Sequence, residues 1–358
     1  MPRRAAPAGS TVGGRARWSR PIAGLCTAAV FVCAACASCE KNDGPAPPPT
    51  APTAATAPPP LPTMGTVPRP PATGPTATGP VATGPRPPGT IPTLTPPGPS
   101  GPKPSAGCGK APPAVGFLAG QTIAVAGAPR TFGLYVPAGY DPNKGYPLIF
   151  ALHGDGGDGA GARAGMKLEA PAREGAIFVY PDGRGRTWDL NTMPPEKNPD
   201  VLFFDALVAK LGDTMCLARG RVFVTGHSNG AYMANQLGCW RGGVVRAIAP
   251  HSGGGPYDST NKGYDEHGDL VCPGSPVAAL VVHGQADGVV APSEGQFSLS
   301  HWRRVDGCQA STAKVAPEPC VAYTGCARPV VSCSVPGLGH GEWSQAAQLT
   351  WDFFASLP

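Results

Sequence analysis

Aromatic residues are absent from residues 40–107, a segment that holds roughly half of the chain's 47 prolines. Within it the pentad xATGP is repeated as PATGPTATGPVATGP. A segment with so little apolar surface cannot offset the entropy lost on ordering its backbone. We therefore predict a disordered, proline-stiffened spacer at 40–107, followed by one domain at 108–358 that is long enough for a full hydrophobic core.

A long apolar run is also missing from the N-terminus. The stretch 22–37, IAGLCTAAVFVCAACA, is too short and too soon interrupted for a comfortable membrane span. Several arginines precede it: Arg3, Arg4, Arg15, Arg17 and Arg20. A charged region followed by a short apolar core is typical of a secretory signal, so we predict a signal peptide at 1–39 and a location outside the cytoplasm.

Two ways of processing this signal stay open. Ala35 and Ala37 form an A-x-A site, which predicts cleavage after Ala37 and free secretion. Alternatively, CASC at 36–39 is similar to a bacterial lipobox, although a cysteine stands where leucine is usual. In that case Cys39 carries lipid and the spacer tethers the domain to a membrane. The C-x-x-C pairs here lie in the apolar core of the signal and do not indicate a metal site.

The domain lacks three further patterns. It has no basic stripe interleaved with aromatic residues, and much of the net charge of +5 comes from arginines before Pro21, so nucleic acid is excluded as a partner. The glycine-rich stretch 154–161, GDGGDGAG, lacks the Lys-Ser/Thr of a phosphate loop and the ligand spacing of an EF-hand. No paired C-x-x-C motif indicates zinc.

Short apolar runs alternate with helical patterns along the domain. Five runs predict buried parallel strands, at 146–154, 176–183, 221–226, 245–253 and 277–287. Amphipathic helices are predicted at 200–212 and 344–357, and an antiparallel entry hairpin at 121–137. This alternation predicts an α/β fold with a mostly parallel, doubly wound sheet whose active residues gather beyond the carboxyl ends of the strands.

One serine stands between two glycines directly after a predicted strand. In RVFVTGHSNGAYMANQLGC, residues 221–239, the turn Gly226-His227-Ser228-Asn229-Gly230 fits the G-x-S-x-G nucleophile elbow. Both glycines are expected to be needed because a Cβ would collide with the approaching strand and helix. The alternative is a tight turn with a capping serine.

A serine hydroxyl needs an imidazole to take its proton and a carboxylate to orient that imidazole. Asp287 closes the run AALVVHGQAD and His340 lies in the loop PGLGHGEW, in the order Ser, acid, His that this fold uses. For the oxyanion we expect the backbone N–H of Asn229 and that of Asp155, with Gly154 allowing a close approach.

With these residues assembled, the domain resembles secreted polyhydroxybutyrate depolymerases and feruloyl esterases. The likeness is carried by RTFGLYVPAGYDPNKGYPLIFALHGDGGDG, YPDGRGRTWD, DVLFFDALVAKL, the elbow segment, VVHGQADGVV and GLGHGEW. It implies an α/β-hydrolase fold without cofactor or metal, with Ser228, His340 and Asp287 in the roles above. Two departures are the charged Asp155 beside the carbonyl site and the lack of a following polymer-binding domain, which weakens the case for crystalline polyester.

The leading hypothesis is a secreted or lipid-anchored serine esterase whose substrate is a hydroxyalkanoate, a hydroxycinnamoyl sugar of plant cell walls or an acetylated glycan. Trp343, Trp188 and His227 are expected to contact that substrate, although core packing is an equal alternative for Trp188. The other hypotheses are a non-catalytic surface lipoprotein that binds a polymer, and a serine peptidase, for which the chain lacks a propeller.

Eight cysteines in an exported domain predict disulfides, with many pairings open. They are Cys108, Cys216, Cys239, Cys272, Cys308, Cys320, Cys326 and Cys333. We expect Cys216 to pair with Cys239, since these flank the strand and helix around Ser228. Such a bond would close a loop of about two dozen residues and stabilise the domain by roughly 3 kcal/mol.

Overall fold

The computed structural model describes residues 104–266 and 268–358. The predicted signal peptide, Cys39 and most of the predicted spacer lie outside these residues. The described domain begins before Cys108, because the buried Ser105 hydroxyl donates to the carbonyl of Met215 (2.6 Å) and accepts from the N–H of Leu217 (2.8 Å). In the described part of the chain, every helix is too short or too polar to span a membrane.

Ten strands of the described residues form one mixed sheet, in the order β1-β2-β4-β3-β5-β6-β7-β10-β9-β8. They are β1 (Gly116–Val125), β2 (Ala128–Val136), β3 (Tyr146–Leu152), β4 (Ile177–Pro181), β5 (Leu217–His227), β6 (Val245–His251), β7 (Ala278–Gly284), β8 (Thr312–Lys314), β9 (Cys320–Tyr323) and β10 (Val330–Val335). The central strands from β4 to β10 are parallel, and β1 and β2 form the predicted hairpin. The α/β prediction is confirmed.

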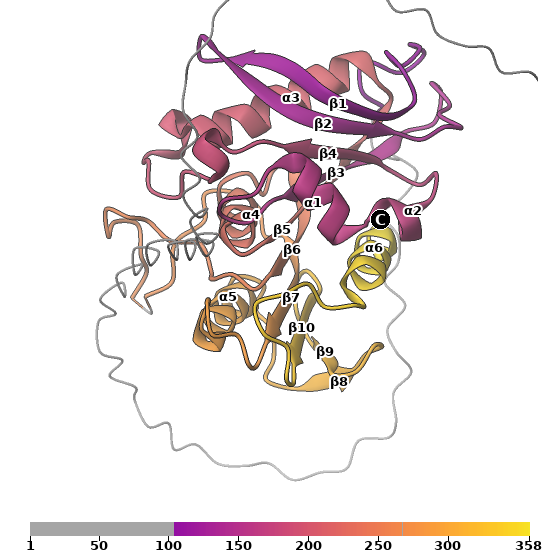
Figure 1. Cartoon of the computed structure of the whole chain (residues 1–358). Coiled ribbons are helices and arrows are strands. Elements are labelled where there is room, and N and C mark those ends of the chain that lie inside the picture. The colour runs from indigo at the N-terminus through magenta and orange to yellow at the C-terminus, as the bar shows by residue number, and fades with distance from the viewer. Residues whose placement is uncertain (1–103, 267) are drawn as a thin grey trace, which may run out of the picture. The chain divides into compact units, whose positions relative to one another are not determined.

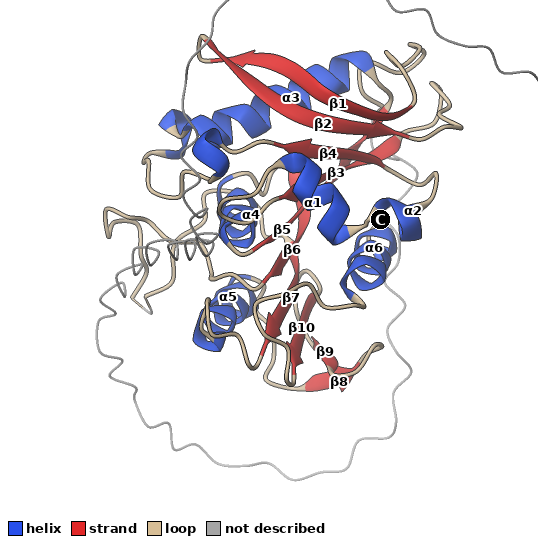
Figure 2. Cartoon of the chain, viewed as in Figure 1, coloured by secondary structure: helices blue, strands red, loops and turns tan. Residues whose placement is uncertain are grey.

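Helices cover both faces of this sheet (Figures 1 and 2). Within residues 104–358 the described chain forms six α-helices: α1 (Gly159–Met166), α2 (Glu169–Ala172), α3 (Pro199–Thr214), α4 (Asn229–Trp240), α5 (Pro292–Val305) and α6 (Ala346–Ser356). The buried side chains of α3, α4 and α5 belong to one hydrophobic cluster, and those of α1, α2 and α6 to another. The predictions at 200–212 and 344–357 are confirmed as α3 and α6.

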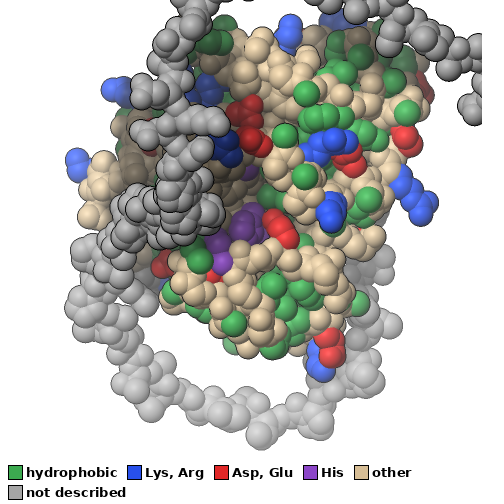
Figure 3. Space-filling model, viewed as in Figure 1, with side chains coloured by type: hydrophobic (Ala, Val, Ile, Leu, Met, Phe, Trp, Pro, Cys, Tyr) green, Lys and Arg blue, Asp and Glu red, His purple; other side chains and the backbone are tan. Residues whose placement is uncertain are grey.

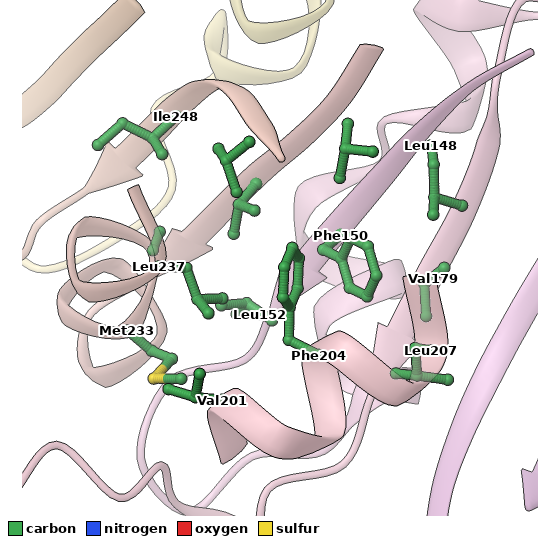
Figure 4. Packing of buried hydrophobic residues seen from close by; sticks show 14 of the residues in the cluster. Leu148, Phe150, Leu152, Val179, Val201, Phe204, Leu207, Met233, Leu237 and Ile248 are labelled. Carbon is green, nitrogen blue, oxygen red and sulfur yellow. The ribbon is translucent and has the colours of Figure 1, made fainter. Parts of the chain in front are cut away.

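Strand β3 shows why the strands read as continuous apolar runs. All seven of its residues are buried, because each face of the sheet is covered. Leu148, Phe150 and Leu152 pack toward α3 and α4 (Figure 4), whereas Ile149 and Ala151 belong to the cluster on the opposite face. The strand therefore fills two cores at once.

Sequence patterns did not indicate the antiparallel edge formed by β8 and β9. β8 has three residues, all exposed, and β9 has only four, so neither is long enough to stand out as a strand in the sequence. Two disulfides hold this edge, Cys308–Cys326 and Cys320–Cys333. The second of these joins β9 directly to its neighbour β10.

All eight cysteines of the domain are paired, which confirms the disulfides but not the expected bond between Cys216 and Cys239. Cys216 instead bonds Cys108, in the N-terminal segment that lies against the start of β5. Cys239 bonds Cys272, in the loop between β6 and β7. The expected pairing was wrong because α4 lies over β5 and β6, which carries Cys239 toward that loop; Gly274 donates its N–H to the Cys239 carbonyl (3.4 Å).

The turn from β5 into α4 leaves no room for side chains at its two glycines. A Cβ on Gly226 would lie 2.2 Å from the carbonyl oxygen of Gly230, and a Cβ on Gly230 would lie 2.3 Å from that of Leu152 on β3. Both obstacles are backbone atoms, which cannot rotate away. The helix can approach the strand ends this closely only because both positions are glycine.

Gly230→Ala should therefore destabilise the domain by about 3 kcal/mol and lower esterase activity, because the methyl group forces α4 away from β3. Gly165→Ala is the matched control, since that helical glycine of α1 has no atom within 4 Å of its added Cβ. The control should be neutral or slightly stabilising. Chemical denaturation of both variants measures the difference, and an unchanged midpoint for Gly230→Ala would contradict the packing argument.

Folding buries the carboxyl group of Asp306, the residue directly after α5. The residue is 1% exposed, and neither carboxyl oxygen has a well-formed hydrogen bond. Burial raises its pKa from 3.8 to about 7, although the nearby Arg328 opposes the rise. Between these pH values the folded protein binds a proton that the unfolded chain lacks, so stability falls as the pH rises from 3.8 to about 7.

Asp306→Asn should raise the melting temperature at pH 8, by about 4–8 °C if it recovers on the order of 2 kcal/mol. At pH 4 the effect should be small, because the folded aspartate is already neutral there. Asp352→Asn, which changes an exposed carboxylate, serves as the control. Calorimetry at both pH values measures the melting temperatures. An equal increase in melting temperature at pH 4 and pH 8 would show that the charge of Asp306 is not the cause.

Candidate active site

Ser228 stands in the turn between β5 and α4 with a strained backbone. Its φ of 56° and ψ of −121° lie in a region that residues other than glycine rarely adopt. The turn is held from both sides: the N–H of Ser228 donates to the carbonyl of His251 (3.0 Å), and its carbonyl accepts from Ala231 (2.8 Å) and Tyr232 (3.2 Å). This conformation directs the serine to the carboxyl edge of the sheet.

Asp287 and His340 reach the same edge from two neighbouring parallel strands, β7 and β10. The loops after these strands are joined by backbone hydrogen bonds, from Gln285 to the carbonyl of Val335 (2.9 Å) and from Ala286 to that of Leu338 (3.0 Å). The carboxyl ends of adjacent parallel strands lie side by side, so residues more than 50 positions apart become neighbours.

The structure brings the three predicted residues into one hydrogen-bonded chain. Nδ1 of His340 lies 2.8 Å from Oδ2 of Asp287, and Nε2 of His340 lies 2.9 Å from Oγ of Ser228. Because a carboxylate can only accept, Nδ1 carries the hydrogen. In a neutral ring Nε2 then has a free lone pair, which accepts the serine hydroxyl.

Asp287 remains a carboxylate because its hydrogen bonds outweigh its burial. Its side chain is 0% exposed, and burial alone would raise its pKa. The bond from His340 and two bonds to Oδ1 from the N–H groups of Val289 and Val290 (2.9 Å each) lower the pKa instead. His283, which the sequence analysis passed over, lies 3.5 Å from Oδ2 and donates from Nε2 to the carbonyl of Val290 (3.0 Å).

Two backbone N–H groups beside the serine are available to a ligand. Among the described residues, no acceptor lies within hydrogen-bonding reach of the N–H of Asn229 or that of Asp155. Gly154 lies next to the nucleophile candidate, since a Cβ there would be 3.3 Å from the Cβ of Ser228. This is the arrangement expected of two oxyanion donors flanking a reactive serine.

His153 fixes the orientation of this glycine-rich loop. Its Nε2 accepts the N–H of Gly183 (2.9 Å), so Nδ1 carries the hydrogen and donates to the carbonyl of Gly154 (2.7 Å). In a trans peptide the C=O and the next N–H point in opposite directions. Holding the Gly154 carbonyl on one side therefore leaves the N–H of Asp155 on the other. The sequence offered one signal for this role, a histidine directly before the loop.

The three residues expected to contact substrate have different environments. Trp188 is buried at 5% exposure, donating from Nε1 to the carbonyl of His153 (2.8 Å) and from its backbone to the side chain of Asn229 (2.8 Å). These bonds hold it beneath the glycine-rich loop, as in the core-packing alternative, and its contact with substrate stays a prediction. Trp343 is half-buried against one of the two core clusters.

His227 does lie beside the triad residues, with its ring centroid 4.8 Å from that of His340. Burial, reinforced by His340, lowers its pKa to about 4. Among the described histidines, only His227 and His340 are half-buried, and the others are buried. Figure 3 shows histidine side chains gathered in a hollow of the surface.

Acidic groups near the site had not been anticipated. Glu342, two residues after His340, has no hydrogen-bond partner among the described residues, and burial raises its pKa to about 7. Glu294 of α5 accepts a hydrogen bond from the hydroxyl of Tyr232 (3.1 Å), in the first turn of α4. The loop of His340 and the first turn of α4 therefore each have a carboxyl group that the sequence analysis did not include.

One group of candidate metal ligands occurs among the described residues, formed by Cys239, Cys272 and His301 within 4.8 Å of one another. The two sulfurs are bonded to each other, so neither is a thiolate able to ligate a metal. Asp158 of the glycine-rich loop caps α1 by accepting the N–H of Gly161 (2.8 Å).

Known proteins resemble the whole domain. The chain is 33% identical over 272 residues to feruloyl esterase C of Emericella nidulans, and 30% identical over 282 residues to feruloyl esterase D of Neurospora crassa. Each match covers 70% of this chain and 90% of the relative. No family profile matches the chain.

Among solved structures, the acetyl xylan esterase of Aspergillus awamori superposes with a TM-score of 0.52 at 19% identity. The match covers 65% of this chain and 98% of that protein, which supports the fold. The sequence relatives carry the stronger conclusion, because they are at least 30% identical to this chain over nine-tenths of their length. The chain thus belongs to the feruloyl esterase family, and it is a carboxylic ester hydrolase with the α/β-hydrolase fold.

Proposed function

We propose that this protein is an extracytoplasmic serine esterase that cleaves feruloyl or related hydroxycinnamoyl esters, with Ser228 as nucleophile, His340 as general base and Asp287 as the orienting acid. The observation that carries the proposal is the hydrogen-bonded chain from Asp287 through His340 to Ser228. The hydroxycinnamoyl substrate is favoured over a hydroxyalkanoate because the sequence relatives named above are feruloyl esterases.

In the first half-reaction His340 Nε2 removes the proton of Ser228 Oγ as this oxygen bonds to the ester carbonyl carbon. The N–H groups of Asn229 and Asp155 stabilise the negative charge that develops on the carbonyl oxygen. His340 then returns the proton to the leaving alcohol oxygen as the C–O bond breaks. The acyl group remains on Ser228.

In the second half-reaction a water replaces the alcohol. His340 takes a proton from this water, the hydroxide adds to the acyl carbon, and the Ser228 oxygen leaves with the proton from His340. Throughout, the carboxylate of Asp287 stabilises the imidazolium that forms twice in the cycle. Its lowered pKa suits this role, because the acid must stay ionised.

The location follows from the redox state of the cysteines. The four disulfides of the domain require an oxidising compartment, which agrees with a cleaved signal peptide. Lipid attachment at Cys39 remains a prediction of the sequence pattern. Mass spectrometry of the mature N-terminus distinguishes cleavage after Ala37 from a lipidated Cys39.

Hydrolysis rates on a panel of esters test the substrate class. Methyl ferulate, a hydroxybutyrate oligomer and an acetylated xylan represent the three groups left open by the sequence. The proposal expects the highest kcat/KM on methyl ferulate. A clear preference for the hydroxybutyrate oligomer would overturn the hydroxycinnamoyl assignment while leaving the serine mechanism intact.

Ser228→Ala should lower kcat on any hydrolysed ester by about 10³-fold or more, because it removes the nucleophile without adding bulk. Ser300→Ala, on the exposed face of α5, should leave the rate unchanged. A fluorophosphonate probe should add one adduct to the wild type and none to Ser228→Ala. Normal activity of Ser228→Ala with an unchanged melting curve would reject Ser228 as nucleophile.

The rate kcat/KM should fall tenfold per pH unit on the acid limb, because only a neutral His340 can accept the serine proton. His227 should not contribute to this limb: burial lowers its pKa to about 4, so it is already neutral above pH 5. Profiles of the wild type and His227→Gln should therefore bend at the same pH. A shifted limb in the variant would assign the titration to His227, and a flat profile from about pH 5 to 8 would exclude a histidine base.

A further inference from the structure

A groove of about 680 Å³ lies between α2 and α6, outside the triad. Figure 1 shows these two helices side by side, with α6 near the C-terminal end of the chain. The polar and aromatic residues that line the groove are Lys167, Arg173, Ser344, Gln348 and Trp351. The other residues that line it are alanines and a proline. The volume falls within the range of small-molecule sites.

The charged residues that line this groove, Lys167 and Arg173, are both basic. Lys167 and Arg173 are exposed, and neither forms an ion pair with another described residue. None of the described residues that line the groove is acidic. Glu174, adjacent to Arg173 in sequence, instead accepts the N–H of Gly139 (2.9 Å). Two cations are therefore free to bind an anionic ligand.

The other lining groups suit a sugar ring. Trp351 is half-buried. The far edge of its indole lies close to Gly175, since a Cβ added to Gly175 would be 2.7 Å from Cη2 of Trp351. Gln348 donates from Nε2 to Asp352 (2.7 Å), which leaves its carbonyl oxygen as an acceptor. Indole offers an apolar platform for the C–H face of a sugar, while the amide and the Ser344 hydroxyl can bond its hydroxyl groups.

One loop of the chain links the groove to the active site. Ser344, which lines it, is four residues after His340, so the two Cα atoms are at most about 14 Å apart. A linear polymer is long enough to contact two places on the protein at such a separation, whereas a small ester is not.

We propose that the groove between α2 and α6 binds a uronate-bearing polysaccharide, whose carboxylates pair with Lys167 and Arg173 and whose sugar ring lies on Trp351. The further idea that this polymer carries the ester attacked by Ser228 rests on the proposed function. The affinity of the groove for an acidic sugar chain is independent of that function. The indole of Trp351 beside the two cations favours a sugar chain over an anionic membrane, because a sugar ring can pack on an aromatic face.

Binding is measured on the full chain carrying Ser228→Ala, so that no ester is cleaved during the titration. The probe is a polygalacturonate oligosaccharide, and its carboxyl-reduced form is the uncharged counterpart. The acidic form should bind on the order of tenfold more tightly, and its affinity should weaken as salt rises. Equal affinity of the two forms would overturn the proposal, as would binding to anionic phospholipid vesicles without binding to the oligosaccharide.

Variants locate the site. Lys167→Gln with Arg173→Gln should weaken oligosaccharide binding on the order of tenfold. The matched control is Lys197→Gln with Lys210→Gln, which removes the same charge from exposed positions elsewhere and should change little. Trp351→Phe retains an aromatic ring and should bind more weakly than wild type without loss of fold. Unchanged binding by the Lys167 and Arg173 variant would assign the affinity to another surface.

A rate comparison separates this proposal from that of the active site. In an otherwise wild-type chain, the Lys167 and Arg173 variant should hydrolyse methyl ferulate normally but show a raised KM on a feruloylated, uronate-bearing polysaccharide. If Ser228→Ala retains esterase activity while the groove variants lose oligosaccharide binding, the proposed catalytic mechanism is wrong and the proposed sugar-binding site is still supported. If the KM on the polymer is unchanged, the groove has no part in substrate binding.

Discussion

The close approach of α4 to the ends of β3 and β5 is the constraint on which the rest of the site depends. All twelve residues of this helix are buried, so it cannot shift without disturbing the core around it. Asn235, within it, bonds the carbonyl of Gly254 and accepts from Ser298 and Trp302 of α5. The strained Ser228 conformation persists because these contacts hold the helix in place.

Much of the fold and the triad could be predicted because the relevant signals are local. Parallel strands covered on both faces appear as apolar runs, and their order then places the carboxyl ends at one edge. The elbow around Ser228 needs glycines that are visible in the sequence. Asp287 and His340 follow strands whose ends converge, so the direction of the chain alone brings them together.

Other features depend on how distant loops fold over one another, which no local pattern encodes. For Trp188 the sequence left substrate contact and core packing equally open, and its position depends on how its loop folds beneath the glycine-rich loop. The partner of Cys216 comes from a segment 108 residues earlier. The role of His153 depends on the N–H of Gly183, which lies after a different strand.

The hydrogen bonds between the loops that follow β7 and β10 have a consequence for how the site is held. They tie the loops of the acid and the base to each other, while Ser228 is anchored on β6 through His251. Because β6 is itself paired with β7, all three residues are held by one continuous sheet. The 2.9 Å contact between His340 Nε2 and Ser228 Oγ, over which the proton travels, is therefore fixed by the spacing of neighbouring strands.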